Sequence, residues 1–364
     1  MKAKRCGFWL VPMSLAIAWI ALTALGAIGE ASAAEPSSWA KYPPALREVL
    51  TKAQQEGEVL WDDGSSRRTV EQENLVMKAF EATMGFPLKV RFYFHGQAVP
   101  QTVSRYITEA KSGVNPGADI FTPSGADHLS RLKEGKASMP VDWAAFGVAP
   151  ADYEARIYGI YLWDNIRGII YNKQQVPEKE VPRRYADLLD PKWKGKIVGT
   201  SNLSHFPFWA VALGEQQAFD LVRKLMADQK IVLTPTVTDP PGRVASGEFA
   251  IGLAHNTRPL RDMGAPLAWA LMQEKSGSIP SYGVVLNNCK HPNAAQALLY
   301  FLGNTPAGQK AFFGATYGGK RTTPGTDAFE VLGEGRGLPM ATFDWITKKK
   351  PQLEKEFAKI LGIR

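Results

Sequence analysis

Cysteine is almost absent from this 364-residue chain, which contains only Cys6 and Cys289. Cys6 precedes a long apolar run near the N-terminus, so Cys289 would be the only thiol left if that run were removed. One thiol excludes an internal disulfide and a cysteine-rich metal cluster. The sequence also lacks a Gly-x-Ser-x-Gly elbow, a His-Glu-x-x-His pair and a P-loop, so three common catalytic motifs are missing.

Concentrated charge and internal repeats are missing as well. The formal net charge is +8, but the only dense basic run is the three-lysine segment at 348–350. Nucleic-acid-binding proteins usually cluster their basic residues in a patch or stripe, which this sequence does not do, so we expect no nucleic-acid partner. The positive balance is a general surface property that favours anionic solutes.

The N-terminus has the pattern of a secretory signal peptide. Lys2, Lys4 and Arg5 precede an uncharged apolar run over 7–29, which is followed by the small residues of Ala-Ser-Ala-Ala at 31–34. We therefore predict that residues 1–33 are cleaved and that the protein is periplasmic. The alternative is an uncleaved anchor, because the apolar run is long enough to span a bilayer.

The remaining ~330 residues are more than one core usually holds, so two domains are expected. Apolar runs predict strands that alternate with amphipathic helices, and most of these strands end in polar or glycine-containing loops. The predicted strands cover 58–61, 88–94, 118–121, 197–200, 231–234, 249–254, 267–272 and 279–286. Strand–loop–helix units of this kind favour parallel sheets with a ligand site at the carboxyl edge.

The segment 159–172 is a β-branched and aromatic run that is unusually long for one strand of a single sheet. It is followed by breaks at Pro177 and Pro182, a short helical piece at 185–189 and a new strand. The string Tyr-Ala-Asp-Leu-Leu-Asp-Pro-Lys-Trp-Lys-Gly-Lys-Ile lies at 185–197. This region resembles the crossover of two-lobed, type II periplasmic solute-binding proteins that serve ABC importers, most closely the ferric-iron-binding subfamily and its relatives.

The resemblance implies an α/β fold of two lobes, each a mainly parallel sheet flanked by helices, joined by two crossover segments. Lobe one would comprise 34–158 and 283–364, and lobe two would comprise 159–282. The protein would be a monomer that needs no cofactor, captures a small solute and delivers it to a membrane permease with its ATPase. A receptor of this kind binds by population shift, because the ligand stabilises a closed arrangement of the lobes.

Candidate ligand-binding residues are the polar tips of the strands and the residues on or near the crossings. On lobe one they are Ser65, Ser66, Arg67, His95, Gln97, Thr122 and Ser124. On lobe two they are Thr200, Ser201, Asn202, His255, Asn256, Thr257 and Arg258, and on or near the crossings they are Trp163, Asn165 and Tyr282. Each hydroxyl could instead cap a helix, and each histidine could make a structural hydrogen bond.

The ligand class follows from a departure from the family pattern. Ferric-iron binders carry two adjacent tyrosines after the strand that corresponds to 249–254, whereas this chain has Thr257 and Arg258 there. A guanidinium repels a metal cation but binds carboxylate or phosphate in two-point fashion. A small organic carboxylate or phosphorylated anion is therefore the leading ligand, and ferric iron or a metal complex is the alternative.

Two other functions are alternatives to that of a transport receptor. A secreted enzyme would need a catalytic set, and the serines, histidines and aspartates present are too common to define one. A receptor that reports to a membrane sensor instead of a transporter would have the same sequence features. The identity of the solute is not encoded in any motif of this sequence.

Overall fold

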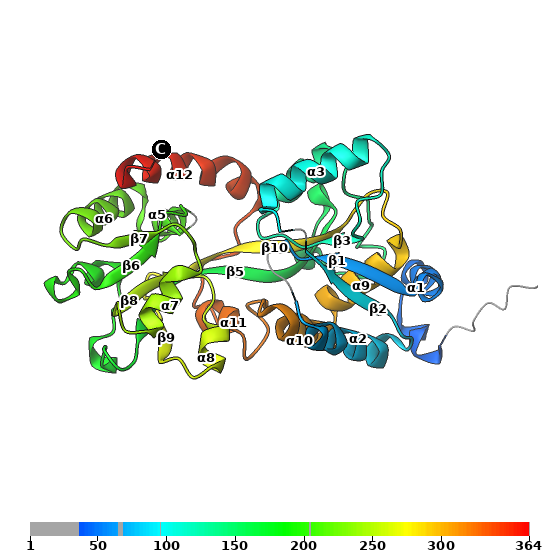
Figure 1. The fold of residues 1–364 in the computed structure, drawn as a ribbon, viewed down its shortest axis with the longest axis horizontal. Helices are drawn as coiled ribbons and strands as arrows, with labels where there is room; N and C mark the ends of the chain where they lie inside the picture. Colours follow the sequence, from blue (N-terminus) through cyan, green and yellow to red (C-terminus); the bar gives the residue numbers. More distant parts are fainter. Residues whose placement is uncertain (1–35, 65–67, 95, 204, 364) are drawn as a thin grey trace, which may run out of the picture. The chain divides into compact units, whose positions relative to one another are not determined.

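In the computed structural model, which describes residues 36–64, 68–94, 96–203 and 205–363, strand β5 (Gly159–Asn172) runs between two lobes (Figure 1). The first part of β5 pairs antiparallel with β10 (Gly277–Val285), from Ile160 opposite Gly283 to Arg167 opposite Gly277. From Gly168 onward it pairs instead with β8 (Ile251–Ala254) and β9 (Leu267–Ala270). Its 14 residues therefore serve two sets of partners, which confirms the long crossover predicted over 159–172.

Lobe one is built on β1 (Glu58–Asp62), which pairs in parallel with β2 (Lys89–Tyr93) and β3 (Ile120–Phe121). Strand β3 then pairs antiparallel with the end of β10. The helices are α1 (Pro44–Glu56), α2 (Val70–Met84), α3 (Val99–Lys111), α4 (Ala126–Glu134), α9 (Pro292–Asn304) and α10 (Pro306–Thr316), and the short strand β4 (Tyr153–Glu154) pairs with β5.

Lobe two repeats this arrangement around β6 (Ile197–Thr200), which pairs in parallel with β7 (Val232–Thr234) and β8. Its helices are α5 (Phe206–Leu213), α6 (Glu215–Ala227), α7 (Asp239–Ala245) and α8 (Arg258–Asp262). The hydrogen-bonded path through the 10-stranded sheet is β2-β1-β3-β10-β5-β8-β6-β7, and β4 and β9 pair with β5 beside this path. The two crossing strands thus occupy the middle of one continuous ladder, with a parallel half on either side.

The short helical turns include the predicted piece at Tyr185–Leu189, which is a 3-10 helix. The others are Ser37–Lys41, Pro150–Asp152, Ala155–Ile157, Glu178–Glu180 and Pro191–Trp193, and a π-helical turn covers Trp345–Lys349. Among the residues described, no helix is both long enough and apolar enough to cross a membrane. The predicted signal peptide, 1–33, lies outside the described residues.

The local sequence explains where α2 begins. Thr69 Oγ1 accepts from the Gln72 backbone N–H, and Gln72 Oε1 accepts from the Thr69 backbone N–H at 2.8 Å, so the two residues form a capping box. Val76, Phe80 and Met84 then face the core with no exposed surface. The same helix ends at Gly85, whose positive φ of 85° suits glycine.

Each lobe has its own core. In lobe one Trp61, Phe80 and Phe301 belong to one buried cluster, and in lobe two Trp193, Ile197 and Trp209 belong to another. Separate cores allow the lobes to move as rigid bodies about the strands that connect them.

The packing of the C-terminal helix differs from the predicted lobe assignment. The C-terminus was assigned wholly to lobe one, yet α12 (Lys350–Leu361) packs on α5 and α6, where Leu353 and Phe357 join the lobe-two core (Figure 1). An amphipathic helix shows which face it buries but not which partner covers that face.

Helix α11 (Asp327–Leu332) departs from the predicted assignment in the same way. Its Ala328, Val331 and Leu332 pack in a cluster with Ile166 and Trp269. The chain therefore returns to lobe two after α10 and does not remain in lobe one. The lobe boundaries at 158/159 and 282/283 stay a prediction.

Candidate functional site

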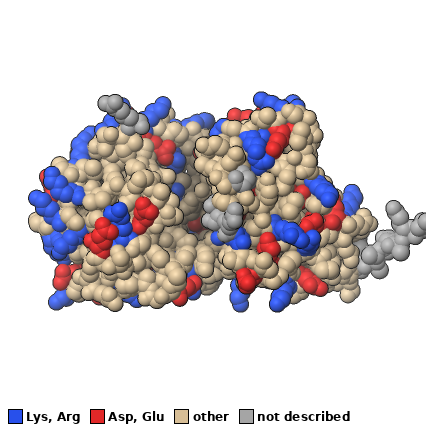
Figure 2. Space-filling model, viewed as in Figure 1, with Lys and Arg blue, Asp and Glu red and all other residues tan. Residues whose placement is uncertain are grey.

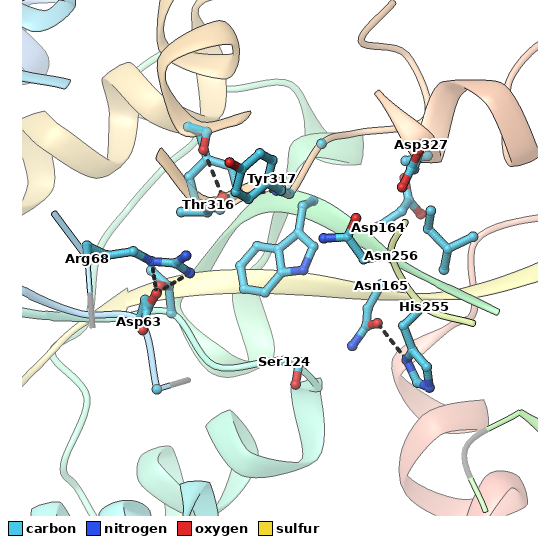
Figure 3. A pocket seen from close by; sticks show the side chains of 18 of the residues that line it. Asp63, Arg68, Ser124, Asp164, Asn165, His255, Asn256, Thr316, Tyr317 and Asp327 are labelled. Carbon is cyan, nitrogen blue, oxygen red and sulfur yellow. Dashed lines mark hydrogen bonds and ion pairs between the residues drawn. The ribbon is translucent and has the colours of Figure 1, made fainter. Parts of the chain in front are cut away.

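A pocket lies where the carboxyl ends of the parallel strands from both lobes approach β5 (Figure 3). It holds about 780 Å³ of space, part of it open to solvent. The space-filling view shows the surface hollowed between the two lobes (Figure 2). Its polar and aromatic lining comprises Asp63, Arg68, Thr122, Ser124, Trp163, Asp164, Asn165, His255, Asn256, Phe312, Thr316, Tyr317 and Asp327.

The lobe-one wall carries an ion pair at the end of β1. Arg68 donates from Nε to Asp63 Oδ2 at 2.6 Å, and its Nη2 also contacts that oxygen. The side chains are only 12% and 5% exposed, respectively. Behind them, Tyr106 donates its hydroxyl to Asp62 at 2.5 Å, and burial raises the pKa of Asp62 to about 6.

The carboxylate of Asp164, on β5, is fully buried and is neutralised by Arg321. Nη2 of Arg321 lies 2.8 Å from Asp164 Oδ1, and the Arg321 backbone N–H donates to Oδ2 at 2.8 Å. Ser278, on β10, donates to the same carboxylate at 2.7 Å. Asp164 therefore connects both crossing strands to the segment after α10.

Asp327, at the start of α11, is neutralised in a similar manner. It accepts from the Thr257 backbone N–H at 2.8 Å and lies 3.2 Å from Arg261 Nη1. Each of the three carboxylates in the lining, on Asp63, Asp164 and Asp327, thus has an arginine partner. The pocket does not present a cluster of unbalanced negative charge to a ligand.

The lobe-two wall is formed by Asn165 and His255. Asn165 Oδ1 accepts from Arg167 Nη1 at 2.8 Å and lies 3.2 Å from His255 Nδ1. The His255 ring packs edge-on against His205, with ring centroids 4.4 Å apart. Burial, and the charge of Arg167 after it, hold the pKa of both histidines well below the ordinary value, so both rings are neutral at pH 7.

Aromatic rings form the floor of the pocket. Trp163 and Phe312 both line the pocket, and their ring centroids are 5.4 Å apart. Phe312 in turn stacks on the buried Trp61 at 5.8 Å. Gly318 permits this approach, because a Cβ there would lie 3.2 Å from Trp163 Cγ and 2.8 Å from the Phe312 ring.

Six of the predicted site residues line this pocket: Thr122, Ser124, Trp163, Asn165, His255 and Asn256. Four others, Ser65, Ser66, Arg67 and His95, lie outside the described residues. The remaining seven, Gln97, Thr200, Ser201, Asn202, Thr257, Arg258 and Tyr282, are not in the lining. A residue's position at the end of a strand is therefore not enough to place it in this pocket.

Arg258 differs most from its predicted environment. Its Nε lies 2.7 Å from Asp262 Oδ1, and its Nη1 donates to the Gly325 carbonyl at 3.2 Å. Thr257 is fully buried against Asp327, and Tyr282 packs in a buried cluster with Tyr161. The expected two-point contact of Arg258 with an anion is therefore not available in this pocket as it stands.

Sequence reasoning missed the side of the pocket formed by α10 and the loop after it. Phe312, Thr316 and Tyr317 come from that side, and no strand end points to them. The pair Gly318-Gly319 was the only local signal, since adjacent glycines mark a close approach. Asp63 could have been predicted as a site residue from the sequence, because it directly follows β1.

Sequence comparison assigns the chain to a family. The model for bacterial extracellular solute-binding proteins matches residues 76–328. The chain belongs to this family. No curated protein sequence gave a match.

Solved structures of solute-binding proteins share the fold of this family member. Iron-bound HitA from Pseudomonas aeruginosa is 19% identical, with a TM-score of 0.58 over 82% of this chain and 98% of HitA. AfuA from Actinobacillus pleuropneumoniae, bound to fructose-6-phosphate, is 18% identical, with a TM-score of 0.58 over 85% and 99%. PotD from Streptococcus pneumoniae, a spermidine/putrescine transporter component, is 14% identical, with a TM-score of 0.59 over 84% and 98%. One fold thus accommodates very different solutes.

Proposed function

We propose that this solute-binding protein captures a small anionic solute in the pocket around Trp163 and delivers it to an ABC importer from the periplasm. The observation that carries the proposal is that one pocket draws its lining from both lobes and from β5 between them. A solute that contacts both walls stabilises the arrangement in which the walls are close. Such a site needs neither a cofactor nor a catalytic group.

Charge balance supports an anionic or neutral polar solute over a polyamine. The three carboxylates of the lining already have arginine partners, so a cation would have to compete with those pairs. The available groups include the Ser124 hydroxyl and the Asn165 amide, both of which can donate to oxygen. The fructose-6-phosphate of AfuA shows that this fold can hold a phosphorylated solute.

Ferric iron or a metal complex is the alternative solute. Within the described residues there is no group of three or more histidine, cysteine, aspartate or glutamate side chains placed to hold a metal ion. A ferric complex would therefore need to bring most of its own ligands, as a chelate does. Direct ligation of iron is not favoured by any contact in the pocket.

A thermal-shift screen tests the proposal. The panel contains citrate, inorganic phosphate, fructose-6-phosphate, spermidine and ferric citrate, each over a range of concentrations. A ligand that binds only the folded state raises the melting temperature as its concentration rises. We expect at least one anion to do so, to bind one-to-one in calorimetry and to be recovered chemically unchanged. A product formed from the bound solute would instead indicate an enzyme.

A further inference from the structure

The orientation of the Asn165 amide is fixed by two neighbours behind the pocket wall. Arginine only donates hydrogen bonds, so the Asn165 atom that lies 2.8 Å from Arg167 Nη1 must be the oxygen. That oxygen also lies 3.2 Å from His255 Nδ1. Since an amide oxygen only accepts, His255 carries its proton on Nδ1.

The supporting residues are held firmly in place. Arg167 is 4% exposed, and its Nη1 also donates to the backbone oxygens of Asn165 and Ile166 at 3.0 and 2.8 Å. Its position on β5 is fixed by pairing with Gly277 of β10. An amide whose oxygen already accepts two donors cannot turn over without losing both.

The nitrogen of the same amide faces the pocket. In Figure 3, Asn165 Nδ2 points away from His255 and toward the side of the pocket where Ser124 lies. Among the described residues, none accepts a hydrogen bond from Nδ2. The side chain therefore offers two N–H donors to whatever fills the pocket.

We propose that Asn165 is a specificity-determining residue that donates to an oxygen atom of the solute, and that Arg167 and His255 are positioning residues for it. This inference rests on the proposed function and deepens it, because it assigns the chemistry recognised at the lobe-two wall. The solute atom is a carboxylate, phosphate or carbonyl oxygen. An ammonium group, which only donates, cannot pair with Asn165 Nδ2.

The central test compares Asn165→Asp with Asn288→Asp, a matched charge change at an exposed asparagine outside the pocket. The carboxylate introduced by Asn165→Asp can still accept from Arg167 and His255, so the wall keeps its shape, but the variant loses the donors and adds negative charge. We expect calorimetry to show about ten- to a hundred-fold weaker binding of citrate, inorganic phosphate or fructose-6-phosphate. Spermidine should bind more tightly than to the wild type, and Asn288→Asp should change neither affinity.

The positioning role has its own pair of comparisons. Arg167→Met and His255→Leu remove the donors to Asn165 Oδ1, whereas Arg167→Lys and His255→Asn retain a donor. We expect each conservative variant to restore most of the anion affinity that its apolar counterpart loses. Because Arg167 is buried, its variants could fail to fold. In that case the anion affinities of His255→Leu and His255→Asn test the positioning role. Equal affinities within both pairs would overturn the positioning role.

A direct spectroscopic measurement completes the test. The side-chain amide signal of Asn165, identified by its absence in Asn165→Asp, should shift when the wild-type protein is titrated with the tightest of these anions. Equal anion affinity in Asn165→Asp and Asn288→Asp would overturn the inference while leaving solute capture intact, as would a wild-type preference for spermidine. Failure of all four probes to bind would count against the proposed function as well.

Discussion

Asp164 and Arg321 form a buried ion pair between β5 and the segment that follows α10, with Arg321 Nη2 2.8 Å from Asp164 Oδ1. Ser278 on β10 donates to the same carboxylate, so the pair joins three passes of the chain beside the pocket. Removing one partner of such a pair leaves an uncompensated charge with little solvent around it. Asp164 therefore ties the two crossing strands to the segment after α10.

Asp164→Ala should lower the free energy of unfolding by about 3–5 kcal/mol, because the Arg321 side chain, which is only 19% exposed, would lose its partner. Urea unfolding at pH 7 measures this change. As a control, Asp220→Ala removes an exposed partner of Arg223 on α6 and should leave the unfolding midpoint unchanged. Equal effects of the two substitutions would show that the Asp164 pair does not hold the crossing together.

Gly277→Ala should destabilise the fold, because a Cβ at this position would lie 2.1 Å from Cδ1 of Phe208 on α5. Overpacking of this kind costs about 1–3 kcal/mol. Gly242→Ala is the matched control, since nothing lies within 4 Å of a Cβ there and the residue is in α7. The thermal midpoint should fall for Gly277→Ala only, and a fall for neither would mean that α5 packs less closely on β10.

Asp62 should make stability depend on pH in an unusual direction. Burial raises its pKa to about 6 from an ordinary value of 3.8, so the folded state binds a proton that the unfolded state releases between these values. The contribution of Asp62 to stability is therefore greatest below about pH 4 and declines until about pH 6. The difference is about 3 kcal/mol at most.

Asp62→Asn removes this titration and tests it directly. The stability of the wild type relative to the variant should fall as the pH rises from about 4 to 6 and then become constant. Chemical unfolding of both proteins at several pH values gives the comparison. A difference that does not change over that range would show that Asp62 titrates near its ordinary value.

Phe357→Ala should destabilise lobe two, although residue 357 lies far along the chain from that lobe's other elements. Phe357 is fully buried, with its ring centroid 5.0 Å from Phe219 and 5.6 Å from Phe206. Loss of a buried phenylalanine costs about 3–5 kcal/mol. Relative to the wild type, the variant should show faster hydrogen exchange in α5 and α6 but unchanged exchange in α1 and α2. A uniform increase over both lobes would contradict the observed packing of α12.

The sequence was most informative where structure is local. The long strand over 159–172 is present as predicted, because its β-branched and aromatic run is a property of neighbouring residues alone. Pairing of β5 with two sets of strands agrees with its length, since 14 residues exceed the usual length of a strand that serves one set of partners. The two-lobed fold could therefore be predicted.

The candidate site was only partly accessible because a pocket is made from distant segments. Asn165 could be selected as a polar residue in an apolar strand, but the contacts that fix its amide come from Arg167 and His255, the latter 90 residues away. The loop after α10 approaches Trp163 at Gly318, and only tertiary packing brings these distant residues together. Arg258 illustrates the opposite error, because its local partner Asp262, four residues on, was overlooked.

The most direct measurement of the central claim is the distance between the lobes with and without solute. Spin labels at Val114→Cys and Val232→Cys report on lobe one and lobe two, since both side chains are exposed, with Cys6→Ser and Cys289→Ser included to prevent other labelling. Pulsed electron–electron double resonance should give a shorter mean distance between the two labels, and a narrower distribution, once the anion that binds most tightly in the thermal screen is added. An identical distribution at saturating solute would contradict capture of a solute by closure of the two lobes.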